Sequence, residues 1–373
     1  MYDMSTSQAV DVFRIPMSGP ADISGLSRLI SEGALDPRTI VAVMGKTEGN
    51  GCVNDFTREY ASTTLAAFLG TKLELSPAEV EQRIAFVMSG GTEGVLSPHI
   101  TVFARARGSG ATAGPKRLAI GISATREFLP EEIGRETQIS ETAKAVEAAM
   151  IDAAIEDIAD VHFVQIKCPL LTAERIQAAR RRGKNVCTDD TYASMGYSRG
   201  ASALGVVAAL RETTSAPSAE ALLSDWSTYS AVASTSAGIE LMRNVVIVMG
   251  NSAYSTSRYT IGHAVMKDAI DVEAVLAAFG SAGLNLMSSN GFAARDRLVG
   301  VFAKAEASPS GEVRGARHTM LDDSDINSTR HARAAVGGLL AGFAGTGLVY
   351  VSGGAEHQGP PGGGPIAVIA RAA

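Results

Sequence analysis

The stretch RIAFVMSGGTE, residues 83–93, decides how this chain folds, because its pattern returns twice more along the sequence. An apolar run ends in serine, and a small residue, a glycine, any residue and a glutamate follow. The matches are Ser89-Gly90-Gly91-Thr92-Glu93, Ser236-Ala237-Gly238-Ile239-Glu240 and Ser352-Gly353-Gly354-Ala355-Glu356. Short apolar runs rich in β-branched residues are typical of buried strands that stop at a tight turn. The sequence therefore predicts three related strand ends.

A strand that ends in lysine precedes each of these serine strands. IVAVMGK ends at Lys46, VHFVQIK at Lys167 and LVGVFAK at Lys304. A Ser/Thr-Arg pair lies between each lysine and its serine, ahead of an alanine-rich stretch. These pairs are Thr57-Arg58, Ser198-Arg199 and Thr329-Arg330. Because Ser and Thr are preferred N-caps, we expect each arginine in the first turn of a helix.

The same order of features, repeated three times, predicts an α/β (α+β) fold of three similar repeat units around a pseudo-threefold axis. Linker-like segments at 108–115 and 251–257 place the units at residues 1–107, 112–251 and 256–373. Two further helical stretches are expected at residues 141–155 and 263–279.

Composition limits the classes of function. Hydrophobic residues make up 46% of the 373 residues and charged residues 19%, which is typical of a compact globular protein. Lys and Arg number 33 against 39 Asp and Glu, a net charge of −6 that leaves no basic footprint for nucleic acid or an anionic membrane. These proportions favour a small-molecule partner.

Compartment and membrane association follow from local patterns. The three cysteines form no CxxC motif, and the N-terminal stretch lacks a secretory pattern, so a cytoplasmic protein is expected. Residues 334–355 carry no charge, yet seven glycines dilute their hydropathy. We interpret that segment as a buried helix, a glycine turn and a strand rather than a membrane span.

The repeated lysines, arginines and serines would converge on one axis if the units pack around a centre. A strand-end serine followed by a small residue and glycine presents backbone N–H groups to a ligand oxygen. A neutral lysine can activate the serine hydroxyl, and fixed arginines can bind carbonyl or oxyanion oxygens. The alternative is that these residues form only ion pairs between the units.

Other polar clusters give weaker signals. Aspartates precede the arginines, and either they position the arginine loops or they bind a metal; they are Asp55, Asp189, Asp190, Asp322, Asp323 and Asp325. The six histidines show no HExxH or other paired ligand spacing, which disfavours a zinc hydrolase.

One difference between the units suggests which pair is active. Glu48 follows Lys46 by two residues and Glu306 follows Lys304 by two, whereas Cys168 and Pro169 follow Lys167. A neighbouring carboxylate keeps lysine protonated, but a general base must be neutral. The pattern therefore predicts that Lys167 and Ser236 form the working pair.

The chain resembles the cyanuric acid hydrolase/barbiturase family over essentially its whole length. The motifs that carry the resemblance are VMGKTEGNGCVNDFTREYA, VMSGGTEGVLSPH, FVQIKCPLL, TYASMGYSRGASALG, ASTSAGIEL, HTMLDDSDINSTRHARA and VSGGAEHQGPPGGGP. The resemblance implies a barrel-like core of strands with helices outside, a homotetramer, and three Ser-Lys pairs around one substrate. It also implies hydrolytic opening of cyanuric acid to carboxybiuret, which decarboxylates to biuret.

The resemblance also implies residue roles. Ser236 would be the nucleophile and Lys167 its base, and Lys46 and Lys304 would polarise or position the substrate. The remaining substrate-binding groups would be Arg58, Arg199 and Arg330 with Ser89, Gly90, Ala237, Ser352 and Gly353.

No cofactor for turnover is implied, but a structural Mg2+ or Ca2+ near the C-terminus is. Its ligands would be Glu306, Ala355, Gln358, Gly359, Pro360 and Gly363, with Glu312 as an alternative acid. Two rival functions remain at this stage: a barbiturase that uses the same constellation, and a non-catalytic binder of cyclic imides.

Overall fold

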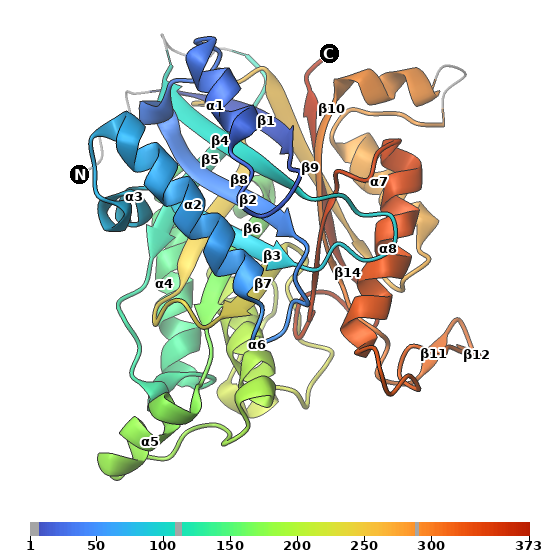
Figure 1. Cartoon of the computed structure of the whole chain (residues 1–373). Helices are drawn as coiled ribbons and strands as arrows, with labels where there is room; N and C mark the ends of the chain where they lie inside the picture. The colour runs from blue at the N-terminus through green and yellow to red at the C-terminus, as the bar shows by residue number, and fades with distance from the viewer. Residues whose placement is uncertain (1–6, 109–113, 288–290) are drawn as a thin grey trace.

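Three four-stranded sheets with one shared strand order build the molecule (Figure 1). The computed structural model describes residues 7–108, 114–287 and 291–373. Each sheet runs first, fourth, second, third strand of its own segment of chain. The first sheet contains β1 (Gln8–Pro16), β4 (His99–Arg107), β2 (Ile40–Thr47) and β3 (Ala85–Gly90). The second contains β5 (Arg117–Ala124), β8 (Val245–Ser252), β6 (Val161–Pro169) and β7 (Ala233–Gly238). The third contains β9 (Tyr259–Met266), β14 (Gly364–Arg371), β10 (Leu298–Ala305) and β13 (Tyr350–Gly353).

Helices connect the strands within each unit. They are α1 (Ser24–Ser31), α2 (Phe56–Leu73), α3 (Pro77–Arg83), α4 (Glu136–Asp152), α5 (Ala173–Arg181), α6 (Thr191–Leu210), α7 (Val272–Ser281) and α8 (Ser328–Ala344). A small hairpin of β11 (Glu312–Val313) and β12 (Ala316–Arg317) extends from the third unit. The long helices α2, α6 and α8 each join a lysine strand to the parallel serine strand, as a parallel pair requires.

The starts of these long helices correct two expectations. The N-caps are Asp55, Asp190 and Asn327 rather than Ser or Thr, and each side chain accepts a backbone N–H of the first turn. Arg58 and Arg330 do lie in a first turn, but α6 begins at Thr191 and Arg199 lies in its interior. Acceptor side chains as short as Asp and Asn serve equally well as caps, so the Ser/Thr signal did not locate the start of α6.

The helix expected at 263–279 is also only partly correct. Residues 259–266 form strand β9, and the helix α7 begins at Val272 after its cap Asp271. The β9 segment pairs antiparallel with β14, and this tertiary pairing outweighs the local helical signal of residues 263–266. The expected linker at 108–115 falls largely on residues 109–113, which lie outside the described part of the chain.

Both faces of each sheet are covered. Helices pack against the outer faces, and the inner faces meet in a core that all three units share. At the centre of that core, the ring of Phe302 lies 6.1 Å from Phe103, 5.8 Å from Phe163 and 5.9 Å from Tyr350, measured between centroids. Burial on both faces explains why the strands read as near-continuous apolar runs.

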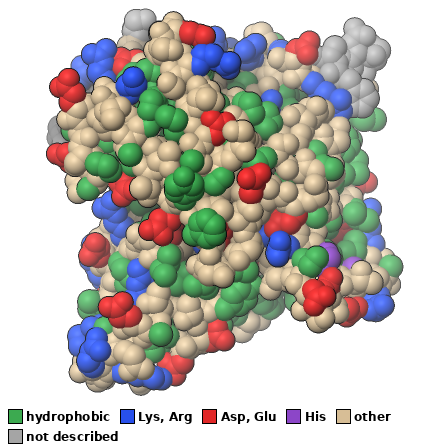
Figure 2. All heavy atoms as spheres, in the orientation of Figure 1, with side chains coloured by type: hydrophobic (Ala, Val, Ile, Leu, Met, Phe, Trp, Pro, Cys, Tyr) green, Lys and Arg blue, Asp and Glu red, His purple; other side chains and the backbone are tan. Residues whose placement is uncertain are grey.

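The central arrangement of strands is not a closed barrel. Within the described residues the three sheets stay separate, and a single bridge from Ser230 to Gln358 joins the second and third units. On the face shown in Figure 2, acidic and basic side chains are interspersed. No helix in the described part of the chain is long and apolar enough to span a membrane. The uncharged segment at 334–355 forms most of α8, a turn at Gly345 and β13.

Candidate active site

The lysine and serine strands place their polar ends side by side. In the parallel pairs, Lys46 lies opposite Ser89, Lys167 opposite Ser236 and Lys304 opposite Ser352. All three lysine side chains are buried. Because the three sheets meet around one axis, the three pairs come together in a single region, as the repeat predicts.

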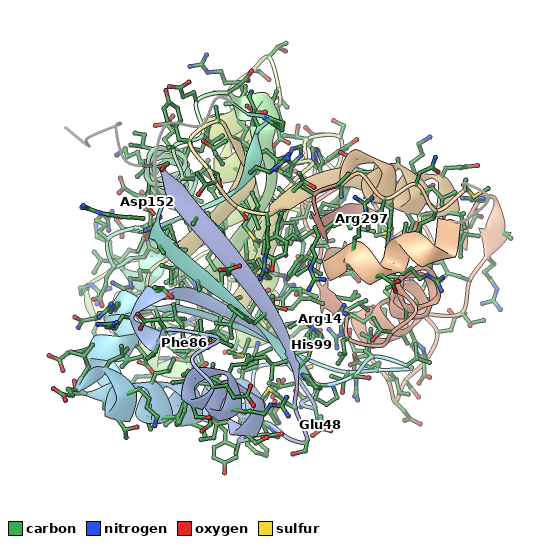
Figure 3. All side chains as sticks on the ribbon, turned by 90° about the horizontal axis from the view of Figure 1, so that it is seen from above. Arg14, Glu48, Phe86, His99, Asp152 and Arg297 are labelled. Carbon is green, nitrogen blue, oxygen red and sulfur yellow. The ribbon has the colours of Figure 1, made fainter. Side chains whose placement is uncertain are left out.

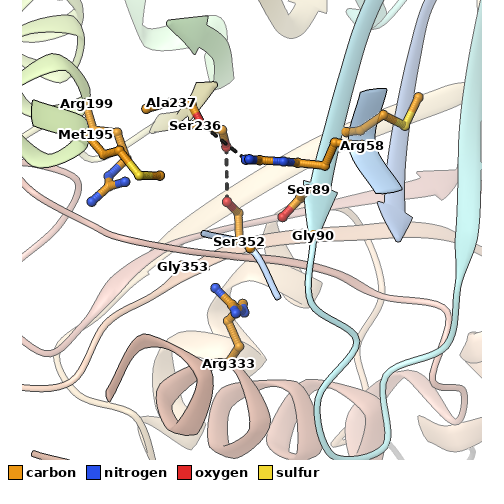
Figure 4. A pocket seen from close by; sticks show the side chains of 12 residues that line it. Arg58, Ser89, Gly90, Met195, Arg199, Ser236, Ala237, Arg333, Ser352 and Gly353 are labelled. Atoms are coloured by element: carbon orange, nitrogen blue, oxygen red, sulfur yellow. Dashed lines mark hydrogen bonds between the residues drawn. The ribbon is translucent and has the colours of Figure 1, made fainter. Parts of the chain in front are cut away.

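One pocket lies at the meeting point of the three units (Figure 4). Its cavity volume is about 30 Å³, so it can admit only a small molecule and not a polymer. Its walls carry the three strand-end serines and the small residue after each, together with three arginines. The lining residues are Gly51, Arg58, Met88, Ser89, Gly90, Met195, Arg199, Ser236, Ala237, Arg333, Ser352 and Gly353.

Each lysine reaches into a neighbouring unit. Lys46 Nζ donates to the Val351 carbonyl at 2.8 Å, and Lys304 Nζ donates to the Thr235 carbonyl at 2.7 Å. Lys167 Nζ makes a longer bond, 3.4 Å, to the Met88 carbonyl. In every case the acceptor is the residue just before the neighbour's serine, so the three units form a closed cycle of lysine contacts.

The lysines differ in their serine contacts. Lys46 Nζ lies 3.4 Å from Ser89 Oγ, and Lys304 Nζ lies 3.2 Å from Ser352 Oγ. Lys167 makes no such bond to Ser236 among the described residues; its Nζ lies 2.8 Å from Glu240 Oε1. Ser236 Oγ instead lies 3.1 Å from Ser352 Oγ.

Burial dominates the protonation of all three lysines. It lowers the pKa of Lys46 well below its ordinary value and lowers the pKa of Lys304 to about 7. Burial also lowers the pKa of Lys167, although the Glu240 carboxylate opposes that effect. Burial acts to raise the pKa of Glu240, but Lys167 and Arg58 outweigh it and hold that pKa at about 2.

The argument from a missing acid beside Lys167 is therefore wrong in its premise. Glu48, two residues after Lys46, is exposed and forms no ion pair with that lysine among the described residues (Figure 3). Lys167 is the one whose ammonium forms an ion pair with a carboxylate, and that carboxylate belongs to Glu240, two residues beyond the end of β7. Spacing along one strand did not reveal a partner that the neighbouring strand supplies.

Arginines enter the pocket from three long helices. Arg58 Nη1 donates to the Ala237 carbonyl at 3.2 Å, and Arg199 forms two bonds to Glu356 at 2.5 and 2.7 Å. In the third unit, Arg333 lines the pocket and bonds Glu93 at 2.6 and 3.0 Å. Arg330, which the sequence pattern selected, is not a lining residue; its side chain is 37% exposed and contacts Glu93 at 3.3 Å.

The choice between Arg330 and Arg333 has a geometric reason. Arg330 occupies the same place relative to the helix start as Arg58, which is why the pattern selected it. A residue three positions later lies on nearly the same face of a helix but one turn further along. Arg333 is thus closer to the end of β13, and its side chain is 5% exposed.

The aspartates near the arginine loops act as local supports. Asp55 and Asp190 cap α2 and α6, Asp189 pairs with Arg180, and Asp323 contacts His331. In the described residues no three His, Cys, Asp or Glu side chains gather as a metal cluster.

The residues expected to hold a structural cation lie near the third strand end. Burial, followed by repulsion from Glu356, raises the pKa of Glu306. The loop of residues 359–364 packs closely against this region. A side chain in place of Gly364 would collide with the Lys304 carbonyl, and one in place of Gly362 would collide with Ser308. A half-buried carboxylate with several carbonyls nearby suits a hard cation such as Mg2+ or Ca2+, so the residues present fit that group.

Two of the expected cation ligands already accept hydrogen bonds in the structure. The Gln358 side-chain oxygen accepts the Thr235 N–H at 2.6 Å, and the Ala355 carbonyl accepts the Gln358 N–H at 2.9 Å. A carbonyl has two lone pairs, so both oxygens retain capacity for a cation. Glu312, the alternative acid, lies on the hairpin strand β11 and is exposed.

Three site residues escaped the sequence analysis. Arg333 could have been found from its helical spacing to Arg330, and Glu240 from its place in the repeated pattern. Tyr350 gave no signal: its hydroxyl is buried with no hydrogen-bond partner among the described residues. Burial raises the pKa of that phenol, against the nearby hydroxyls of Ser236 and Ser89.

Comparisons with known proteins agree with this geometry. Residues 11–371 match the family of amidohydrolase ring-opening proteins. A cyanuric acid amidohydrolase of Bradyrhizobium diazoefficiens is 65% identical over 97% of this chain and 98% of that protein. Another, of Pseudomonas sp. strain ADP, is 62% identical over 97% of this chain and 99% of its own. A solved structure described as "Cyanuric acid hydrolase: evolutionary innovation by structural concatenation" superposes with a TM-score of 0.94 at 61% identity, covering 98% of this chain and all of that one. This chain therefore belongs to the family of amidohydrolase ring-opening proteins.

Proposed function

We propose that this chain hydrolyses cyanuric acid, opening the triazine ring to carboxybiuret, which loses CO2 to give biuret. The observation that carries the proposal is the threefold repetition of serine, small residue and arginine around one small pocket. Cyanuric acid has the same threefold symmetry, with three equivalent carbonyls and three N–H groups. The names of the close relatives support this substrate.

Each ring carbonyl would meet one arginine. Arg58, Arg199 and Arg333 line the pocket from three helices and carry donor forks that suit carbonyl oxygens. Ser89 with Gly90, Ser236 with Ala237, and Ser352 with Gly353 would add hydroxyl and backbone donors. Arg330 would act indirectly, because it contacts the Glu93 carboxylate that holds Arg333.

Ser236 would be the nucleophile and Lys167 its general base. Neutral Lys167 takes the Ser236 proton as Oγ bonds to a ring carbonyl carbon. The tetrahedral oxyanion is stabilised by backbone N–H groups and arginine. The C–N bond then breaks, the ring nitrogen takes the proton from Lys167, and water hydrolyses the resulting ester to release carboxybiuret. Lys46 and Lys304 would polarise or position the ring.

Further proposals concern assembly and ions. We propose a homotetramer in the cytoplasm; the three cysteines are free thiols, which suits a reducing compartment. A structural Mg2+ or Ca2+ would be held by Glu306 and by oxygens of Ala355, Gln358, Gly359, Pro360 and Gly363, and would supply local rigidity. Turnover would need no cofactor.

The test is to incubate the purified protein separately with cyanuric acid and with barbituric acid, following ring absorbance and CO2 release. We expect loss of cyanuric acid with biuret as the final product. Loss of barbituric acid alone would assign the sister activity, and loss of neither would refute hydrolysis. Binding of cyanuric acid without turnover would identify a non-catalytic binder.

A further inference from the structure

Two of the three glutamates in the repeated serine motif hold an arginine of the neighbouring unit. Glu93 of the first unit binds Arg333 of the third, and Glu356 of the third binds Arg199 of the second. Both glutamates follow a glycine in the left-handed region: Gly91 has φ +92° and Gly354 has φ +76°. A Cβ at either position would collide with the arginine, so glycine allows the close approach.

The second unit breaks this cycle. By the same rule Glu240 would bind Arg58 of the first unit, but its carboxylate lies on Lys167 of its own unit. The backbone differs as well, because Gly238 is the last residue of β7 and has no positive φ. A Cβ on Gly238 would meet Glu240 itself rather than an arginine.

Arg58 is left incompletely paired as a result. Its Nε is buried without a hydrogen-bond partner among the described residues, and the nearest carboxylate oxygen, on Asp55, is 3.9 Å away. Its two Nη atoms bond only to carbonyls, those of Ala237 and Cys52. An unpartnered N–H on a buried guanidinium is costly, so this atom is an open position for an acceptor.

Lys167 is affected in the opposite way. With Glu240 beside it, its ammonium is paired and it makes no bond to Ser236, whereas the other two lysines do contact their serines. An ammonium held by a carboxylate cannot accept the serine proton. In this arrangement Lys167 cannot act as the general base for Ser236.

We propose that Glu240 is a positioning residue that moves between Lys167 and Arg58. This inference rests on the proposed function and deepens it. With the carboxylate on Arg58, the cycle of three glutamate–arginine pairs is complete, and Lys167 is buried without a counterion. It then loses its proton to solvent and turns to Ser236, ready to accept the hydroxyl proton.

In either position the Glu240 carboxylate neutralises a buried cation. On Lys167 the Glu240 carboxylate neutralises an ammonium; on Arg58 it neutralises a guanidinium while the lysine becomes neutral. The charged and titratable groups that face Lys167 are Glu240, Arg58 and the Cys168 thiol. Only Glu240 among them favours the protonated lysine through a direct bond.

The first test is the pH dependence of kcat/KM for cyanuric acid in Glu240→Gln, with Glu93→Gln as the matched control. A neutral amide cannot hold the proton on Lys167, so we expect the acidic limb of E240Q to move to lower pH by about one unit or more. In E93Q we expect a higher KM and an unmoved limb, because Glu93 contacts arginines alone. An unmoved limb in E240Q, or an equal shift in both variants, would overturn the proposal.

Folding and function are kept apart by two further measurements. If E240Q does not fold, the pH dependence of kcat/KM can be measured in Glu240→Asp, because the shorter side chain weakens the contact with Lys167. We expect its acidic limb to move in the same direction by a smaller amount, and an unmoved limb would overturn the proposal. A crystal structure of Ser236→Ala with cyanuric acid should show Glu240 on Arg58, and Glu240 still on Lys167 would contradict it. Inactive wild type would instead refute the proposed function.

Discussion

The second and third units carry the same lysine, serine and glutamate, yet they present them differently. Lys304 bonds Ser352 at 3.2 Å and its pKa is lowered by burial to about 7. Lys167 lies on Glu240 at 2.8 Å, away from Ser236. The difference teaches that repetition fixes the residues of the site but not their protonation, which depends on where one carboxylate lies.

Removal of the second unit's serine should have the largest effect. Ser236→Ala should lower kcat by about 10³-fold or more, because no other group is proposed to form the acyl bond. Lys167→Ala should lose a comparable factor, about 10²–10⁴. Single-turnover kinetics with cyanuric acid measures both.

Ser352→Ala is the matched control for that comparison. Its proposed role is to bind a ring carbonyl, so a loss of about tenfold, largely in KM, is expected. A greater loss in S352A than in S236A would reverse the comparison and assign the chemistry to the third unit, where the hydrogen bond already exists.

The third unit's arginines provide the next largest effect. Arg333→Lys should raise KM by about 30-fold, because lysine cannot reproduce a planar fork toward both substrate and Glu93. Arg330→Lys, three residues earlier and partly exposed, should change KM by less than about threefold. Steady-state kinetics distinguishes the two variants, and equal increases in KM would indicate that Arg330 also binds the substrate.

The joint between the second and third units should be sensitive to acid. His162 on β6 and His263 on β9 face each other, with their Nδ1 atoms 2.7 Å apart. Burial, with repulsion from His263, lowers the pKa of His162 to about 4, and burial lowers that of His263. Since protonation is easier in the unfolded chain, this stabilisation is complete above about pH 6.5 and is lost as the pH falls toward 4.

The contribution of His162 to that loss is up to about 3 kcal/mol in the free energy of unfolding. Urea unfolding at pH 7 and pH 4.5 should therefore show a smaller fall for His162→Asn than for the wild type. Parallel falls in the two proteins would mean that the histidine pair does not control the acid sensitivity.

The smallest effect expected is that of cation removal at the third unit. Glu306 follows Lys304, whereas the second unit has Cys168 and Pro169 at that place. Chelation should lower the Tm by a few degrees, about 1 kcal/mol, and Mg2+ or Ca2+ should restore it. Glu306→Gln should abolish that response to chelator; a response that persists would place the cation elsewhere.

The sequence predicted the repeated strands and their polar ends because apolar runs and strand-end residues are local signals. The register of Lys167 with Ser236 and of Lys304 with Ser352 follows from that pattern. The boundaries of the three units remain predictions, as do the catalytic roles.

The structure differs from the sequence-based expectations where partners come from distant segments. Glu240 reaches Lys167 across 73 positions of sequence, and Arg333 enters the pocket only because α8 packs against the ends of β10 and β13. The interior position of Arg199 was missed because Asp190, not a serine, caps α6. Each of these differences depends on side-chain direction and tertiary packing, which the spacing of residues along the sequence does not reveal.

The cycle of lysine contacts has a consequence for how the protein is made. The shortest hydrogen bond of the first unit's Lys46 goes to the Val351 carbonyl, 305 residues further along the chain. While the ribosome is still producing the third unit, Lys46 lacks that native acceptor and has only the longer bonds to Ser89 and Gly90 of its own unit, and a buried amino group that is short of acceptors is unfavourable. A chain that stops before β13 would be left with this defect at its centre. The pocket thus forms last, and a prematurely terminated product would be open to proteases before it could bind a ring.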